Sequence, residues 1–261
     1  MLLDESRFRK SILENAFVNI LSYNPGHDGA IACIQNSRLM FSIESEKNSN
    51  YRHSAVSISD VLSSIGELDV IPDVICMGGW GPRDHHEYIH GSHSNSGYRG
   101  ISTAHAIIDK RKLLRGRTDY FSSSHERSHI LCAFGMSALP KGTSCYALVW
   151  EGRLGAFYDI DSDLNITLIA DVLDQPGLRY ALLYGLADPT FPKNGPYPRP
   201  ADAGKLMALA SYSKRNSPTK EESHLLSFLL DGEYRKLSDF EGVENSPYHD
   251  VGLEDPEFRN F

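Results

Sequence analysis

The sequence has few cysteines and no long apolar run. Four cysteines occur in 261 residues, and none of them forms a Cys-x-x-Cys pair, so we expect reduced thiols. No apolar stretch approaches the ~20 residues needed to cross a bilayer. Residues 1–10 are polar and lack the apolar region of a signal peptide. These absences predict a soluble, cytoplasmic protein without a membrane partner.

Basic residues are also in the minority. Lys and Arg number 26 against 34 Asp and Glu, which gives a net charge of -8. An acidic chain repels phosphate backbones, so we expect no nucleic-acid partner. The remaining composition, 41% hydrophobic with 21 Gly and 13 Pro, is that of an ordinary globular protein. Its length predicts one or two domains.

Short apolar runs and turns occur twice in the same order. Three strands and a helix are predicted first at 17–23, 30–34, 39–43 and 57–68, and again at 145–150, 155–160, 165–170 and 178–186. This order predicts an α/β protein with two similarly built β-β-β-α lobes and a ligand cleft between them. The expected domains are an N-terminal extension over 1–15, a first lobe over 16–143 and a partial second lobe over 144–261.

The rest of the chain completes this interpretation. A buried strand over 73–77 and a helix over 124–136 are predicted for the first lobe, with loop-like, His-rich sequence over 82–118. The end of the chain is turn-rich, so we expect an incomplete second lobe whose apolar helix faces at 178–186 and 225–230 are uncovered. Uncovered faces of this kind drive association, and a homo-oligomer or a second chain is expected.

The sharpest motif is His125-Glu126-Arg127-Ser128-His129. On a helix, positions i and i+4 share one face, so both imidazoles can bind one first-row metal ion. The same residues match the His-Glu-x-x-His signature of zinc metalloproteases, with Glu126 as general base. Two features weigh against a protease. Arg127 places a charge inside the motif, and Glu151, the candidate third ligand, lies in a strand-turn-strand segment rather than on a second helix. A metalloprotease is kept as the alternative.

Two further segments are candidates for ligand binding. In Asn24-Pro-Gly-His-Asp-Gly29, glycine allows close approach of a ligand, and His27 and Asp28 place a base and a carboxylate at the rim of the lobe. A plain hairpin turn is the competing interpretation. In residues 201–210, Asp202 has the potential to cap a helix and Lys205 could pair with a phosphate. An ordinary capped helix fits that spacing equally well.

Together these residues resemble the O-carbamoyltransferase family of antibiotic and nodulation-factor biosynthesis. The likeness is carried by Asn24-Pro-Gly-His-Asp-Gly-Ala30, His125-x-x-x-His129, Ala147-Leu-Val-Trp-Glu-Gly152, Arg179-Tyr-Ala with Asp188-Pro-Thr, and Asp202-Ala-Gly-Lys-Leu-Met207. The resemblance implies a Kae1-like fold of the actin/Hsp70/sugar-kinase superfamily, which agrees with the repeated β-β-β-α order.

The resemblance also implies a mechanism. ATP and carbamoyl phosphate form carbamoyl adenylate in a C-terminal YrdC-like domain, and the carbamoyl group then passes to a hydroxyl of a small-molecule acceptor. Fe(II) or another divalent metal, held by His125, His129 and a carboxylate at Glu151, binds the adenylate phosphates. His27 and Asp28 match residues beside the acceptor hydroxyl, where His27 could take its proton.

The resemblance also implies contacts to the nucleotide, and the chain differs in length from members of the family. Asn24, Gly26 and Lys205 are expected to bind the nucleotide. Family members are longer, and the chain lacks the rest of the second lobe and the YrdC-like domain. We therefore expect a second chain to supply the missing part. The alternative is a non-catalytic metal- or nucleotide-binding remnant.

Overall fold

The structure is a computed structural model that describes eight stretches of the chain. They are residues 18–26, 28–79, 96–102, 107–113, 116–191, 200–214, 217–239 and 243–260. The chain divides into a first unit, Met1–Leu139, and a second unit, Pro140–Phe261. The extension predicted over 1–15 lies outside the described residues. Within those stretches, no helix has the length and apolar character that a membrane span requires.

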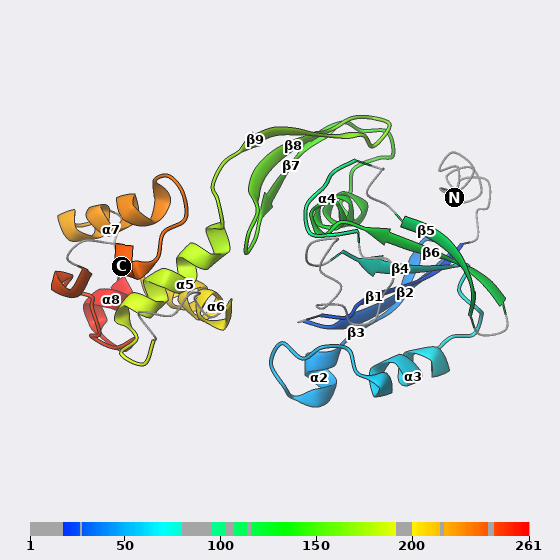
Figure 1. Cartoon of the computed structure of the whole chain (residues 1–261), viewed down its shortest axis with the longest axis horizontal. Helices are drawn as coiled ribbons and strands as arrows, with labels where there is room; N and C mark the ends of the chain where they lie inside the picture. Colours follow the sequence, from blue (N-terminus) through cyan, green and yellow to red (C-terminus); the bar gives the residue numbers. More distant parts are fainter. Residues whose placement is uncertain are drawn as a thin grey trace. The chain divides into compact units, whose positions relative to one another are not determined.

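A six-stranded mixed sheet organises the first unit (Figure 1). Its strands, in sheet order, are β3 (Arg38–Glu44), β2 (Ala30–Gln35), β1 (Asn19–Asn24), β4 (Val74–Gly78), β6 (Gly116–Ser123) and β5 (Ile107–Leu113). β1 to β3 form an antiparallel meander, while β4 runs parallel to both β1 and β6. The meander and the following buried strand confirm the sequence prediction.

The hairpin of β5 and β6 contradicts the last part of the loop predicted over 82–118. Residues 82–95, 103–106 and 114–115 of that prediction lie outside the described residues. It pairs in antiparallel register from Ile107 opposite Ser122 to Leu113 opposite Gly116, and β6 also pairs with β4. The β5 sequence contains Lys110-Arg111-Lys112. It therefore lacks the apolar alternation by which a half-buried strand is recognised. Pairing with β6 defines this strand.

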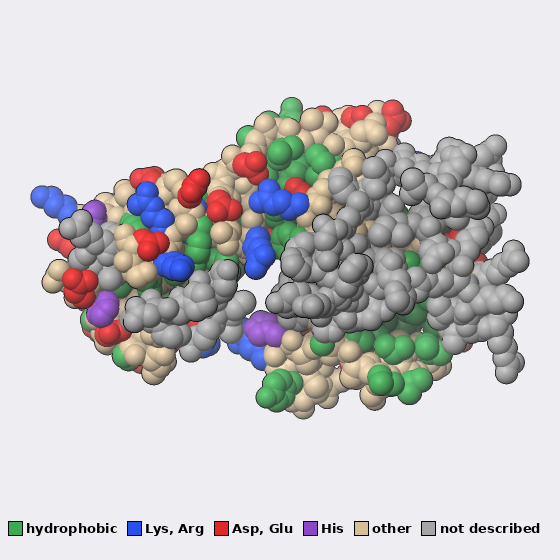
Figure 2. All heavy atoms as spheres, in the orientation of Figure 1, with side chains coloured by type: hydrophobic (Ala, Val, Ile, Leu, Met, Phe, Trp, Pro, Cys, Tyr) green, Lys and Arg blue, Asp and Glu red, His purple; other side chains and the backbone are tan. Residues whose placement is uncertain are grey.

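Helices α2 (Ser45–Ser49), α3 (Ile58–Gly66) and α4 (His125–Met136) belong to the first unit. The predicted helices at 57–68 and 124–136 are confirmed. α3 begins at a capping box, in which the Ser57 and Asp60 side chains each accept the backbone N–H of the other residue. Its apolar residues Ile58 and Leu62 are 79% and 64% exposed, and Figure 2 shows hydrophobic surface over α2 and α3. The core lies in the sheet, around Leu21, Ile31, Cys33, Ile75, Met77 and Tyr120.

A three-stranded antiparallel sheet opens the second unit, followed by helices (Figure 1). The elements are β7 (Cys145–Trp150), β8 (Gly155–Ile160), β9 (Ile166–Asp171), α5 (Pro176–Ala187), α6 (Pro200–Leu209), α7 (Lys220–Leu230) and α8 (Pro256–Asn260). The predicted strands and the helix after them are confirmed. An antiparallel three-stranded meander followed by a helix thus occurs in each unit.

The expectation of uncovered helix faces in this unit is wrong. Leu182 and Leu186 of α5 and Leu225 and Leu229 of α7 are buried in one cluster with Tyr248 and Phe258. The end of the chain covers these helices. The Tyr248 hydroxyl donates to the Glu222 carboxylate at 2.9 Å, and the Asp250 backbone N–H donates to the Leu186 carbonyl at 2.9 Å. Residues beyond 241, although turn-rich, therefore complete a core.

Candidate functional site

The two histidines of the motif converge at the start of α4. Ser124 is the N-cap, and its hydroxyl accepts the Arg127 backbone N–H at 3.0 Å. One turn of helix then brings Nε2 of His125 to 3.0 Å from Nε2 of His129. The Tyr98 ring stacks on His125 with the ring centroids 4.5 Å apart. The predicted i, i+4 pairing is therefore present, with one imidazole half-buried and the other exposed.

This geometry fits a shared metal ion. Two imidazole nitrogens that each lie ~2.0–2.1 Å from one first-row ion are ~3 Å apart, which is the spacing of the two Nε2 atoms here. Tyr98 restricts the orientation of the His125 ring by stacking. The first unit thus brings together two imidazole nitrogens that could serve as ligands. A complete first-row site needs further donors or water.

Two of the three residues between these histidines are held inside the protein. Glu126 and Arg127 are buried. The Glu126 carboxylate accepts the Gly100 backbone N–H at 2.6 Å, and the Ser124 hydroxyl donates to the Gly100 carbonyl. Glu126 therefore ties the segment around Gly100 to the helix start. A protease base must instead present its carboxylate to a reacting water, so this arrangement does not favour the metalloprotease interpretation.

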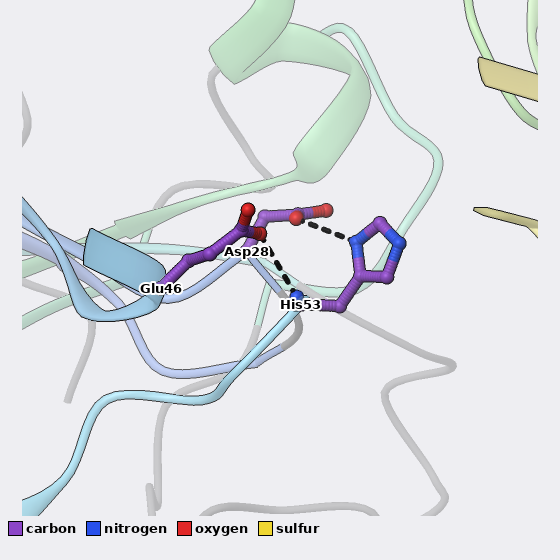
Figure 3. Close-up of side chains that lie close together, drawn as sticks. All are labelled: Asp28, Glu46 and His53. Carbon is purple, nitrogen blue, oxygen red and sulfur yellow. Dashed lines mark hydrogen bonds and ion pairs between the residues drawn. The ribbon is translucent and has the colours of Figure 1, made fainter. Parts of the chain in front are cut away.

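The turn between β1 and β2 presents Asp28 next to a histidine from a later segment. The Asp28 carboxylate lies 2.8 Å from Nδ1 of His53, and the Glu46 carboxylate accepts the His53 backbone N–H at 3.0 Å (Figure 3). The Asn24 amide donates to the Asp28 carbonyl across the turn at 3.4 Å. Gly26 lies in the same turn, and His27 lies outside the described residues. The structure thus gives the predicted carboxylate Asp28 an imidazole partner, His53.

The sequence interpretation missed His53 and Glu46. Asp28 and His53 are 25 positions apart, and no spacing rule links them. Both have left-handed backbone conformations, with φ of 54° and 59°. Such values are uncommon for residues other than glycine, although Asp and His adopt them more often than most. These two backbone conformations are known only from the folded structure.

The remaining predicted residues belong to the second unit. The half-buried Glu151 accepts the Arg153 backbone N–H at 3.2 Å in the β7–β8 turn. Lys205 pairs with the buried Asp202 at 3.2 Å, and its amine lies 5.1 Å from the centre of the Tyr184 ring. α6 begins at Pro200, so Asp202 lies inside the first turn and is not the N-cap that the sequence suggested.

The chain is similar to characterised carbamoyltransferases, although no family model matches it. It is 38% identical over 238 residues to the 3'-hydroxymethylcephem-O-carbamoyltransferase of Amycolatopsis lactamdurans, covering 91% of this chain and 45% of that protein. The protein of the same name from Streptomyces clavuligerus is 37% identical with the same coverage. Nodulation protein U of Rhizobium tropici is 26% identical over 216 residues, 72% of this chain and 35% of that protein. The chain thus spans about half the length of the cephem-modifying relatives.

Proposed function

The chain belongs to the O-carbamoyltransferase family, and from this premise we propose that it forms the acceptor-binding part of an ATP-dependent O-carbamoyltransferase. In the proposed reaction, the carbamoyl group passes from carbamoyl adenylate to a hydroxyl of a small molecule. One observation carries the proposal: the Nε2 atoms of His125 and His129 converge to 3.0 Å in a chain that is 38% identical to such an enzyme. The named relatives act on a 3'-hydroxymethylcephem, an acceptor that carries a hydroxyl of this kind.

The proposed fold is a pair of Kae1-like lobes of the actin/Hsp70/sugar-kinase type. The meander of β1 to β3 and the meander of β7 to β9, each followed by helices, support this proposal. The first unit would then contribute the histidines and the Asp28 turn.

His125 and His129 would hold a divalent metal ion, Fe(II) being the first candidate. When bound, the ion supplies positive charge that neutralises phosphate oxygens and favours departure of the nucleotide. The N-cap at Ser124 fixes the start of the helix, and stacking by Tyr98 orients the ring of His125. In this proposal Glu151 is a third ligand, while Asn24, Gly26 and Lys205 contact the nucleotide.

The turn after β1 would serve the acceptor. As the acceptor oxygen bonds to the carbamoyl carbon, the bond from that carbon to the adenylate phosphate oxygen breaks and AMP leaves. The hydroxyl proton goes to a base in the turn, and His27 is the proposed acceptor of that proton. Asp28, exposed at the same turn, would orient the hydroxyl by accepting a hydrogen bond.

Formation of carbamoyl adenylate is assigned to a separate YrdC-like domain. In our proposal a second chain carries that domain and associates with this one in the cytoplasm. We also propose that the chain forms a homo-oligomer, which sizing of the purified protein tests. The isolated chain is then expected to bind metal and to show no carbamoyl transfer. A metal- or nucleotide-binding protein without catalysis is the competing function.

The experiment is a transfer assay on the chain co-purified with a polypeptide that resembles the remaining part of the relatives. ATP, carbamoyl phosphate and a 3'-hydroxymethylcephem are the reactants. His129→Gln should abolish transfer and the metal ion bound at the His125–His129 pair. His224→Gln is the matched control, because His224 is also exposed on a helix, and it should retain both. Transfer that survives in His129→Gln would contradict the assignment of the histidines, and absence of transfer in the unmodified assembly would favour the non-catalytic alternative.

A further inference from the structure

We propose that Asp28, Glu46 and His53 form a divalent-cation site built from other side chains than the His125–His129 pair; it shares Asp28 with the turn that the proposed function assigns to the acceptor. One ligand atom from each side chain lies within 4.8 Å of the other two, and the three side chains face one another in Figure 3. Donor atoms bonded to one ion at ~2.0–2.3 Å are separated by at most about twice that length. The 4.8 Å limit lies just above this span, so a small side-chain shift lets all three donors reach one ion.

The composition of the cluster selects the class of ion. One imidazole nitrogen and two carboxylate oxygens form a mixed N/O set, which suits a first-row divalent ion such as Mn²⁺, Fe²⁺ or Zn²⁺. The imidazole separates this group from the acidic clusters that are common on protein surfaces. Among the described residues, Asp28, Glu46 and His53 form the group of three or more His, Cys, Asp or Glu side chains whose ligand atoms all lie within 4.8 Å of one another.

Backbone hydrogen bonds hold the three segments that supply the ligands. Asp28 lies in the β1–β2 turn, Glu46 in α2 and His53 in the segment that follows α2. Gly29, next to Asp28, accepts the Ser45 N–H at 2.8 Å and donates its own N–H to the Ser54 carbonyl at 2.9 Å. Each proposed ligand is thus adjacent in sequence to a residue in these bonds. The donors are brought together by the fold rather than by side-chain reach alone.

The charges in the cluster also favour a cation. Two carboxylates approach His53, that of Asp28 at the ring Nδ1 and that of Glu46 at the backbone N–H. Nε2 of that ring accepts a hydrogen bond from Nε of Arg52 at 3.3 Å, which places the ring proton on Nδ1, facing Asp28. On binding, the neutral ring changes tautomer through the solvent: Nδ1 loses its proton, Nε2 gains one, and the Nδ1 lone pair bonds to the ion with no net release of a proton. The exposed Arg52 side chain then has to give up its bond to Nε2.

The test is a titration of the full chain with Mn²⁺ alone, in which electron paramagnetic resonance measures the free ion. A background carrying His125→Gln and His129→Gln removes the first site, so the titration reads the proposed one. In that background we expect one bound Mn²⁺, and Glu46→Gln and His53→Gln should each weaken binding at least about tenfold. Glu44→Gln is the matched control, because Glu44 is a nearby exposed carboxylate that pairs with Lys47. It should change the affinity less than about threefold.

A second measurement separates ligand loss from misfolding. Mn²⁺ should raise the melting temperature of the background protein and of Glu44→Gln, and should leave that of folded Glu46→Gln unchanged. Absence of bound Mn²⁺ would overturn the proposal. Equal binding in the Glu46 and His53 variants, or an equal loss in Glu44→Gln, would overturn it as well. None of these measurements involves carbamoyl transfer. Their outcome therefore does not test the proposed function, which is tested by the transfer assay.

Discussion

Replacing Gly29 by alanine should destabilise the first unit by ~3 kcal/mol. An added Cβ would lie 2.3 Å from the Val56 nitrogen, 2.7 Å from the Ala55 carbonyl carbon and 2.9 Å from the Ser54 carbonyl oxygen. Non-bonded heavy atoms are most favourable at ~3.5 Å or more, so one segment must move by about 1 Å. Overpacking costs typically ~1–3 kcal/mol. The upper end applies here because the opposing atoms belong to the backbone.

The assay is thermal unfolding, with Gly135→Ala as the control. Gly135 lies inside α4, and a Cβ there meets nothing within 4 Å, so alanine should stabilise the helix by ~0.5–1 kcal/mol. For a unit of this size ~1 kcal/mol corresponds to ~4 °C. Gly29→Ala should therefore melt ~10 °C lower and Gly135→Ala a few degrees higher. An unchanged melting temperature for Gly29→Ala would refute the close approach of residues 54–56, and with it the placement of His53 beside Asp28.

Three further predictions concern single side chains. Hydrogen bonds from Asn48 and Ser57 lower the pKa of Asp60 to about 2, so its stabilisation is present above the unfolded pKa of ~3.9 and is lost as the pH falls toward 2. Asp60→Asn should lower the free energy of unfolding by roughly 2 kcal/mol at pH 7, and its loss of stability between pH 4 and pH 2, measured by urea unfolding, should be smaller than that of the unmodified protein. Parallel curves of unfolding free energy against pH for the two proteins would contradict this. Burial raises the pKa of Cys76 to about 12, whereas Cys132 is exposed. Alkylation at pH 8, followed by peptide mass spectrometry, should therefore label Cys132 before Cys76. Equal labelling of the two cysteines would contradict this prediction. Glu126→Gln should reduce stability by about 1 kcal/mol through its bond to Gly100 and leave metal binding intact; metal-dependent casein cleavage that this change removes would instead establish a protease.

Local patterns in the sequence were enough to predict much of the fold. The strands of both meanders follow from short apolar runs between turn residues, and α4 follows from Ser124 and the run after it. The His125–His129 approach also follows locally, because one helical turn separates the two residues. These features depend on neighbours within a few positions, where periodicity and capping decide the outcome.

Features that depend on distant partners were missed. β5 is a strand because β6 pairs with it, although Lys110-Arg111-Lys112 has no strand-like apolar alternation. The α5 and α7 faces are covered because Tyr248 and Phe258 return to them from the end of the chain. The contact of Asp28 with His53 likewise joins separate segments. In each case tertiary pairing, rather than local propensity, determines the result.

The central claim, that this chain is part of an O-carbamoyltransferase, is tested most directly by isotope transfer. Carbamoyl phosphate labelled at its carbonyl carbon is incubated with ATP, a 3'-hydroxymethylcephem and the chain, with and without the YrdC-like partner polypeptide. We predict labelled carbamoyl ester only when both polypeptides are present, and its loss with His129→Gln. Label transferred by the chain alone would contradict the assignment of carbamoyl adenylate formation to a second polypeptide. Label transferred equally well by the second polypeptide in the absence of this chain would contradict the central claim.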